Sequence, residues 1–155
     1  MTLTWRHRFE VDADVEQVAD FHRRPESLKK LTPGLLFLRF LEPPPAELNP
    51  GDELRFRLFA SVIPVDWRAR IEELESTAPN VFGFQDRQLE GPFERWVHRH
   101  RFVDLGGGRT AIEDEIEARF RRHLVWGPVG WQMWVGLPLG WMYRVRQTRR
   151  ALEVD

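Results

Sequence analysis

Residues 84–102 read FQDRQLEGPFERWVHRHRF, and the second half of this segment alternates between two kinds of side chain. Successive side chains of a β-strand point to opposite faces, so every second residue shares a face. One face carries only rings, namely Trp96, His98, His100 and Phe102. The other face is mostly arginine. Small-molecule sites are largely apolar and hold a few placed polar groups, so the pattern predicts a strand that lines a pocket.

Alternation of the same kind recurs along the chain and predicts an antiparallel sheet. The expected strands cover residues 3–11, 35–41, 54–58, 67–75, 82–88, 96–102 and 110–120. Turns rich in Gly, Pro and Asn separate them, and Ile63-Pro64 is interpreted as one such turn. Two short helices should follow the first strand: one capped by Asp12 or Asp14, and one from Glu26 to Leu31.

The last third of the chain predicts one long helix. Apolar residues recur near a 3.6-residue period over residues 131–152, and Pro138 should kink or restart the helix. Residues 124–143 carry no formal charge, and that length reaches the lower limit for a membrane span. Four glycines, two prolines and Gln132 interrupt this segment. We therefore expect a buried amphipathic helix rather than a membrane contact.

Composition restricts the possible functions. The 155 residues include no cysteine, which excludes disulfides, thiolate catalysis and cysteine-based zinc sites. The net charge is −1, so bulk electrostatics do not indicate a nucleic-acid partner. Charged residues begin at Arg6 with no early apolar run, so we expect no secretory signal and a cytoplasmic location. Length and even composition predict a single domain over residues 1–155.

The element order and three motifs resemble the SRPBCC (START/Bet v 1-like) superfamily, in particular its bacterial cyclase/dehydrase-like, ligand-binding branch. The motifs are Leu31-Thr-Pro33, Phe84-x-Asp86-x-Gln88-x-x-Gly91-Pro92-Phe93 and Trp96-x-His98-x-His100-x-Phe102. The resemblance implies an α+β helix-grip fold: a curved antiparallel sheet of six or seven strands around a long C-terminal helix, with two short helices after the first strand. It also implies a hydrophobic cavity between sheet and helix. The superfamily includes lipid carriers, aromatic polyketide cyclases and plant hormone receptors, so it leaves the activity open.

A second polar residue falls on the strand next to the two histidines. With a hairpin tip near Gly106, His98 lies opposite Asp114, and a two-residue slip places His100 opposite Asp114 instead. The carboxylate shares a face with the imidazoles in either register. A buried Asp costs free energy unless it is paired, so we expect a direct His–Asp hydrogen bond.

Several roles remain open for this His/Asp group. Its members can simply satisfy each other's hydrogen bonds inside the core and do no chemistry, or they can orient the polar end of a ligand. His98, His100 and Asp114 are also the candidate catalytic residues of a cyclase or dehydratase, since an imidazole titrates near working pH. A bare His-x-His is a weak metal signal, even with Asp114 as a third ligand. We therefore expect no metal site and no cofactor.

The preferred function is binding of a hydrophobic or aromatic small molecule, lipid- or polyketide-like, in the internal cavity. The alternatives are a cyclase/dehydratase-type enzyme and a module that docks on a membrane or partner through residues 131–142. The sequence carries no signal for the oligomeric state. The candidate ligand-binding residues are Trp67, Phe82, Phe84, Asp86, Trp96, His98, His100, Phe102, Asp114, Ile116, Trp134 and Met142.

Overall fold

The protein is seen in a computed structural model that describes residues 1–60, 62–75 and 78–153. Strands dominate the chain, and helices gather near its two ends. The elements are, in order, β1 (Leu3–Val11), α1 (Val15–Arg23), α2 (Pro25–Leu31), the 3₁₀ helix η1 (Gly34–Leu36), β2 (Arg39–Phe40), β3 (Glu53–Ala60), β4 (Ile63–Glu73), β5 (Val81–Glu90), β6 (Phe93–Gly106), β7 (Arg109–Phe120), α3 (Trp126–Val135) and α4 (Leu137–Leu152).

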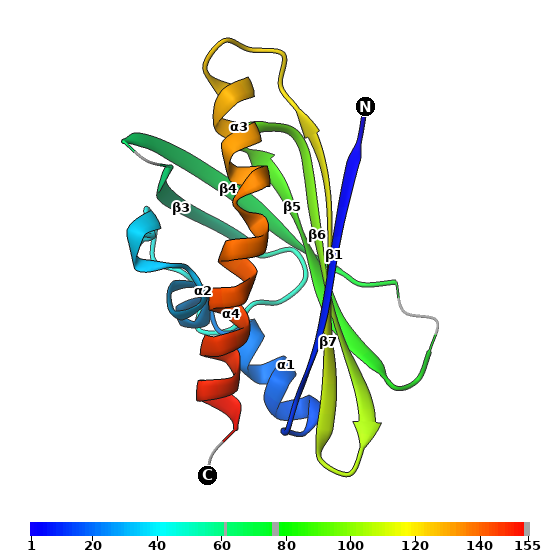
Figure 1. Cartoon of the computed structure of the whole chain (residues 1–155). Helices are drawn as coiled ribbons and strands as arrows, with labels where there is room; N and C mark the ends of the chain where they lie inside the picture. The colour runs from blue at the N-terminus through cyan, green and yellow to red at the C-terminus, as the bar shows by residue number, and fades with distance from the viewer. Residues whose placement is uncertain (61, 76–77, 154–155) are drawn as a thin grey trace.

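All strands belong to one antiparallel sheet in the order β1-β7-β6-β5-β4-β3-β2. The first strand therefore pairs with the last, and the other strands follow as hairpins. In Figure 1, α3 and α4 run the length of the molecule along one face of the twisted sheet, and α1 and α2 lie near one end of that face. This arrangement confirms the predicted α+β helix-grip fold with seven strands.

The β6–β7 hairpin determines which residues meet at the site. Gly107 and Gly108 turn the chain with φ values of 65° and 74°, a conformation that favours glycine in two-residue hairpins. The register shifts once between Asp104 and Gly106. Because the turn lies beyond Gly106, His100 and not His98 stands opposite Asp114. The register slipped by two residues is therefore the observed one, and the predicted pairing of His98 directly opposite Asp114 is wrong.

Three expected strand boundaries are also wrong. The strand expected over residues 35–41 is a 3₁₀ turn followed by the two-residue strand β2. The turn expected at Ile63-Pro64 is instead the start of β4. Pro64 is tolerated there because β5 pairs with β4 only from Arg68 onward, so the proline faces no second neighbouring strand. The same strand ends at Glu73, before the expected end at residue 75.

The expected long helix is divided into α3 and α4 at Gly136. Pro138 lies in the first turn of α4, where its missing N–H costs no hydrogen bond, so the predicted restart is confirmed. None of the helices in the described ranges is long and apolar enough to cross a membrane. Trp141 is buried at 6% exposure, whereas Trp131 is 61% exposed. The uncharged segment is thus only partly covered by the rest of the protein.

The outer face of the sheet carries paired charges. Arginine side chains that point away from the helices meet carboxylates on neighbouring strands. Arg68 reaches Glu53 at 2.7 Å, and Arg99 reaches Glu115 at 2.9 Å. The strand alternation that places arginines outward therefore leaves the inner face for apolar and ring side chains.

Candidate functional site

A cavity of about 720 Å³ lies between the inner face of the sheet and the helices. Its volume falls within the range of small-molecule sites, roughly 300–1,000 Å³. Strands β3 to β6 supply one wall, and α1, α2, η1 and the α3–α4 pair supply the rest. Apolar residues form most of the lining, including Leu54, Phe56, Trp67, Ile71, Leu137 and Trp141.

The structure places half of the candidate ligand-binding residues on this lining. The residues that line the cavity are Trp67, Phe84, Asp86, Trp96, His98 and His100. Phe102 and Ile116 are fully buried in the core, and Asp114 lies behind the imidazoles. Trp134 packs against Phe120, while Phe82 is 45% and Met142 69% exposed. Strand parity identified the inward face correctly, but position along each strand or helix decides which inward residues reach the cavity.

Two histidines and two aspartates form a crossed network on the cavity wall. Asp86 of β5 stands directly opposite His98, and Asp114 of β7 stands directly opposite His100. Each imidazole nevertheless hydrogen-bonds the other carboxylate: His98 Nε2 lies 2.8 Å from Asp114 Oδ1, and His100 Nε2 lies 2.9 Å from Asp86 Oδ2. The two rings lie 3.7 Å apart between centroids. The expected His–Asp hydrogen bond is therefore present, and Asp86 forms a second one.

Asp114 is the most completely paired member of the network. Its Oδ1 accepts the His98 bond and lies 3.4 Å from His100 Nδ1, and its Oδ2 accepts from the indole N–H of Trp141 at 2.9 Å. Burial alone would raise the pKa of Asp114, but the hydrogen bonds from both histidines hold the pKa well below its usual range. The carboxylate is therefore ionised at neutral pH and anchors both rings.

The pKa values of the two imidazoles shift in opposite directions. Burial lowers the pKa of His98, and the charge on His100 lowers it further. Burial also opposes a charge on His100, but its hydrogen bonds to Asp114 and Asp86 prevail and raise the pKa of His100. His100 therefore takes up a proton more readily than His98, and a charge on either ring opposes a charge on the other.

One nitrogen of the network is left available to a ligand. His98 donates through Nε2, so its Nδ1 carries a lone pair, and Asp86 Oδ2 lies 3.6 Å away, beyond hydrogen-bond distance. In the described part of the chain this nitrogen has no hydrogen-bond partner. The site therefore pairs a free basic nitrogen on His98 with a proton held on His100.

The polar lining residues that the sequence interpretation missed include Arg144 and His22. Arg144 extends from α4, and its guanidinium carbon lies 4.9 Å from the centre of the Trp141 ring. Burial lowers the pKa of Arg144, while the charges of Asp114 and Asp86 counteract this effect. His22 donates from Nδ1 to the carbonyl oxygen of Val18 at 2.8 Å, and burial lowers its pKa to about 3.

The helical spacing of α4 carried a signal for Arg144. Leu137, Trp141 and Thr148 are its buried residues, and they recur at intervals of four and seven. Arg144 falls between the last two on the same stripe, three residues after Trp141. A charged side chain on a buried stripe marks a candidate functional residue.

The network has the ligand types of a metal site. Among the described residues, Asp86, His98 and His100 each present one ligand atom within 4.8 Å of the others. However, His100 Nε2 already donates to Asp86, and His100 Nδ1 lies 3.4 Å from Asp114 Oδ1. A divalent cation therefore binds only if it displaces the proton on His100 and breaks that hydrogen bond.

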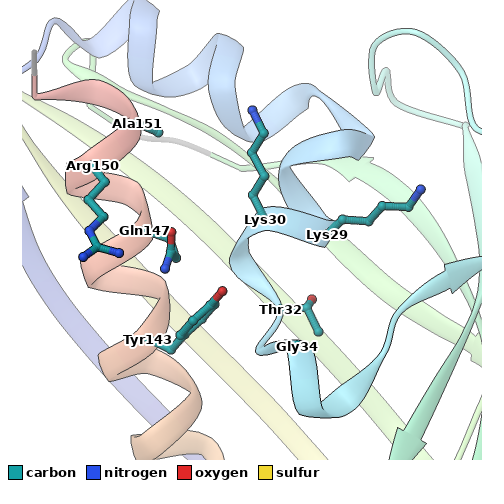
Figure 2. A pocket seen from close by; sticks show the side chains of 8 residues that line it. All are labelled: Lys29, Lys30, Thr32, Gly34, Tyr143, Gln147, Arg150 and Ala151. Atoms are coloured by element: carbon teal, nitrogen blue, oxygen red, sulfur yellow. The ribbon is translucent and has the colours of Figure 1, made fainter.

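A second, shallower groove of about 380 Å³ lies between α2 and α4 (Figure 2). It shares Thr32 and Tyr143 with the large cavity. Three basic residues border it, but the side chains of Lys29, Lys30 and Arg150 point in different directions in Figure 2. The basic groups do not converge on one point, so the groove forms an edge of the cavity rather than a separate anion site.

A family model described as polyketide cyclase / dehydrase and lipid transport matches residues 11–133. The match begins at the end of β1 and extends into α3. It includes Asp86, both histidines and Asp114, and it stops before α4. No curated protein matches the chain.

Solved structures with the same fold include both enzymes and proteins named only by fold. The Zhui aromatase/cyclase from Streptomyces sp. R1128 superposes with a TM-score of 0.75 at 16% identity, covering 99% of this chain and 94% of that chain. A START superfamily protein from Mycobacterium smegmatis gives 0.66 at 16% identity, covering 97% of both chains. Norcoclaurine synthase from Thalictrum flavum gives 0.65 at 14% identity, covering 97% and 86%. At these identities the likeness shows the fold alone.

Proposed function

Since the chain belongs to the polyketide cyclase/dehydrase and lipid transport family, we propose that it binds one hydrophobic or aromatic small molecule in the cavity between the sheet and the C-terminal helices. The observation that carries this proposal is the cavity itself, about 720 Å³ with a mostly apolar lining. Open apolar volume of this size is unusual in a close-packed protein interior and is typical of a ligand site.

The arrangement of the lining supports an amphipathic ligand. Trp67 and Trp96 meet edge to face at 5.4 Å and offer ring surfaces to an apolar body. Polar groups of the lining include Asp86 on β5, His98 and His100 on β6, and Arg144 on α4. The cavity therefore offers a ligand both an apolar surface for its body and polar side chains that orient its polar group.

Native mass spectrometry tests this proposal. The protein is measured as purified, and again after incubation with N-phenyl-1-naphthylamine, a neutral apolar reporter. We expect a one-to-one complex that survives transfer into the gas phase at low collision energy. A protein that takes up neither a cellular molecule nor the reporter contradicts the proposal.

A second candidate function is acid–base catalysis of the cyclase or dehydratase type. The observation that favours it is the pair of imidazoles on the cavity wall, of which His98 has a free Nδ1 and His100 donates to Asp86 through Nε2. The free Nδ1 of His98 removes a proton from a carbon next to a carbonyl, and His100 delivers its proton to a departing hydroxyl, which leaves as water. Asp114 positions both rings, and Asp86 stabilises the proton on His100.

Deuterium exchange separates this candidate from simple binding. The methyl protons next to the carbonyl of 2-acetonaphthone exchange slowly in neutral D₂O, and NMR follows their loss. If His98 acts as a base, the protein accelerates the exchange and His98→Gln abolishes the acceleration while the ketone still binds. Exchange at the uncatalysed rate in the presence of bound ketone contradicts the catalytic role.

A further inference from the structure

We propose that the ligand carries a carboxylate and that the Arg144 guanidinium binds this carboxylate through two parallel hydrogen bonds inside the cavity. This inference rests on the proposed binding function and names the chemical class of the ligand. Neither the family model, which ends before Arg144, nor the sequence interpretation assigns a role to this residue.

Arg144 is a partly buried guanidinium on the cavity lining that lacks a carboxylate partner among the described residues. Its side chain makes no hydrogen bond or ion pair with any residue of the described ranges. The arginines of the outer sheet face differ, since Arg68 and Arg99 lie within 3 Å of carboxylate oxygens. A guanidinium has five N–H donors in a fixed planar fork that matches the two oxygens of a carboxylate. Unpaired donors beside an apolar volume require a partner, and a ligand supplies one.

The carboxylates near Arg144 do not already serve as its partner. The oxygens of Asp114 already face other donors: Oδ1 faces the two histidines, and Oδ2 accepts from the Trp141 indole. Asp86 accepts from His100. Both aspartates lie close enough to stabilise the charge of Arg144, but neither comes within ion-pair distance of it. The guanidinium therefore stays charged and remains open to a ligand.

The balance of charge around the cavity favours an anion. The lining contains two arginines, Arg144 and the solvent-exposed Arg24, but only one carboxylate, Asp86. Positive side chains therefore outnumber negative ones on the lining, which favours a ligand that carries a negative charge.

Arg144 is also held in place before any ligand arrives. Its guanidinium lies over the Trp141 ring, and Trp141 is itself fixed by its hydrogen bond to Asp114. Stacking on an aromatic ring restrains the planar fork while leaving its edge N–H groups free. A restrained donor loses less conformational entropy on binding, which favours a specific polar contact.

Competition binding tests the inference. N-phenyl-1-naphthylamine reports occupancy of the cavity by fluorescence, and 2-naphthoate and its neutral amide 2-naphthamide compete for it. The two competitors share one ring system and differ in charge. We expect 2-naphthoate to bind at least about tenfold more tightly than 2-naphthamide, as a charge-assisted bidentate pair implies.

Variants assign that preference to Arg144. In Arg144→Gln the preference should fall below about threefold, and in Arg144→Lys it should be intermediate, because the charge remains and the fork is lost. Arg146→Gln changes an exposed arginine two residues along the same helix and should keep the wild-type preference. Reporter binding in each variant shows that its cavity is intact.

The outcomes separate the two proposals. If the reporter binds but wild type does not prefer the carboxylate, or if Arg144→Gln retains the preference, the role of Arg144 is wrong while cavity binding stands. If neither the reporter nor either competitor binds wild type, the proposed binding function fails, and the carboxylate proposal fails with it.

Discussion

His98 and Asp114 are hydrogen-bonded diagonally across β6 and β7, although they do not stand opposite each other in the sheet. His98 Nε2 lies 2.8 Å from Asp114 Oδ1, while the residue directly across from Asp114 is His100. The matching diagonal bond from His100 to Asp86 makes the network symmetrical. Three adjacent strands are therefore joined by side chains as well as by backbone, at the wall of the cavity.

Asp114→Asn should destabilise the protein strongly. The substitution removes the charge that stabilises the proton on His100 and leaves buried donors without a full acceptor set. We expect a loss of about 3 kcal/mol in the free energy of unfolding, measured by guanidinium denaturation. Glu113→Gln on the same strand is the control, because Glu113 forms a partly exposed pair with Arg8 and its loss should cost under about 1 kcal/mol. Equal losses in the two variants would show that the network does not hold the sheet together.

His22 should make the protein sensitive to acid. Its pKa falls from 6.5 in the unfolded chain to about 3 in the folded protein, so the unfolded state binds a proton first. The linked stability is intact above pH 6.5 and is lost as the pH falls toward 3, by up to about 1.4 kcal/mol per pH unit. Urea titrations at pH 7, 6, 5 and 4.5 should show a shallower decline for His22→Asn than for wild type.

The exposed His123 provides the matched control for this pH dependence. His123→Asn removes an imidazole outside the cavity and keeps a side chain that can accept the backbone N–H groups at the start of α3. Its stability should decline with acid as steeply as that of wild type. A wild-type profile that runs parallel to that of His22→Asn contradicts the assignment.

Gly83→Ala should disturb the network from the backbone. Gly83 has a φ of 147°, and a Cβ at this position would lie 1.9 Å from the carbonyl oxygen of His100. Strands β5 and β6 must separate locally to admit it, so the melting temperature should drop by an amount equivalent to at least about 2 kcal/mol. Gly34→Ala is the control, since its Cβ would meet nothing within 4 Å. Similar melting temperatures for both variants would refute the close approach.

Zinc should bind weakly at the His/Asp network. A cation must displace the proton of His100 and break its bond to Asp86, and Arg144 adds unfavourable charge nearby. Calorimetric titration with Zn²⁺ at pH 7 should show a Kd no tighter than roughly 10 μM, far weaker than structural zinc sites. Stoichiometric, tight binding with proton release, abolished by Asp86→Asn, would instead establish a metal site.

The inward face of each strand follows from sequence because the side-chain period of a strand is two. Trp96, His98 and His100 therefore fall on the cavity side whatever the register. The register itself depends on where the hairpin turns, and three consecutive glycines at 106–108 allow the tip to move by a residue. The sequence thus limits the residue opposite Asp114 to His98 or His100. Only the structure shows that His100 stands opposite Asp114 while His98 forms the diagonal hydrogen bond.

Contacts between residues far apart in the sequence account for the site features that the sequence did not predict. Asp86 is placed on the inward face by parity, but its bond to His100 depends on the β5–β6 register. Arg144 approaches the network only because α4 packs across the sheet, and no local pattern specifies that crossing. The two-residue strand β2 replaced a longer predicted strand because an apolar run of seven residues does not distinguish strand from irregular chain.

Filling the cavity is the most direct test of the central claim that the protein binds an apolar ligand there. Gly140 lies on the cavity lining within α4, and a Cβ added to it meets nothing within 4 Å. Fluorescence titration with N-phenyl-1-naphthylamine compares wild type, Gly140→Ala and Gly140→Leu. We predict one site in wild type, an affinity within about twofold for Gly140→Ala, and at least a tenfold weaker affinity for Gly140→Leu, with melting temperatures unchanged or raised because both residues favour helix over glycine. Equal reporter affinity in all three proteins would contradict binding in this cavity.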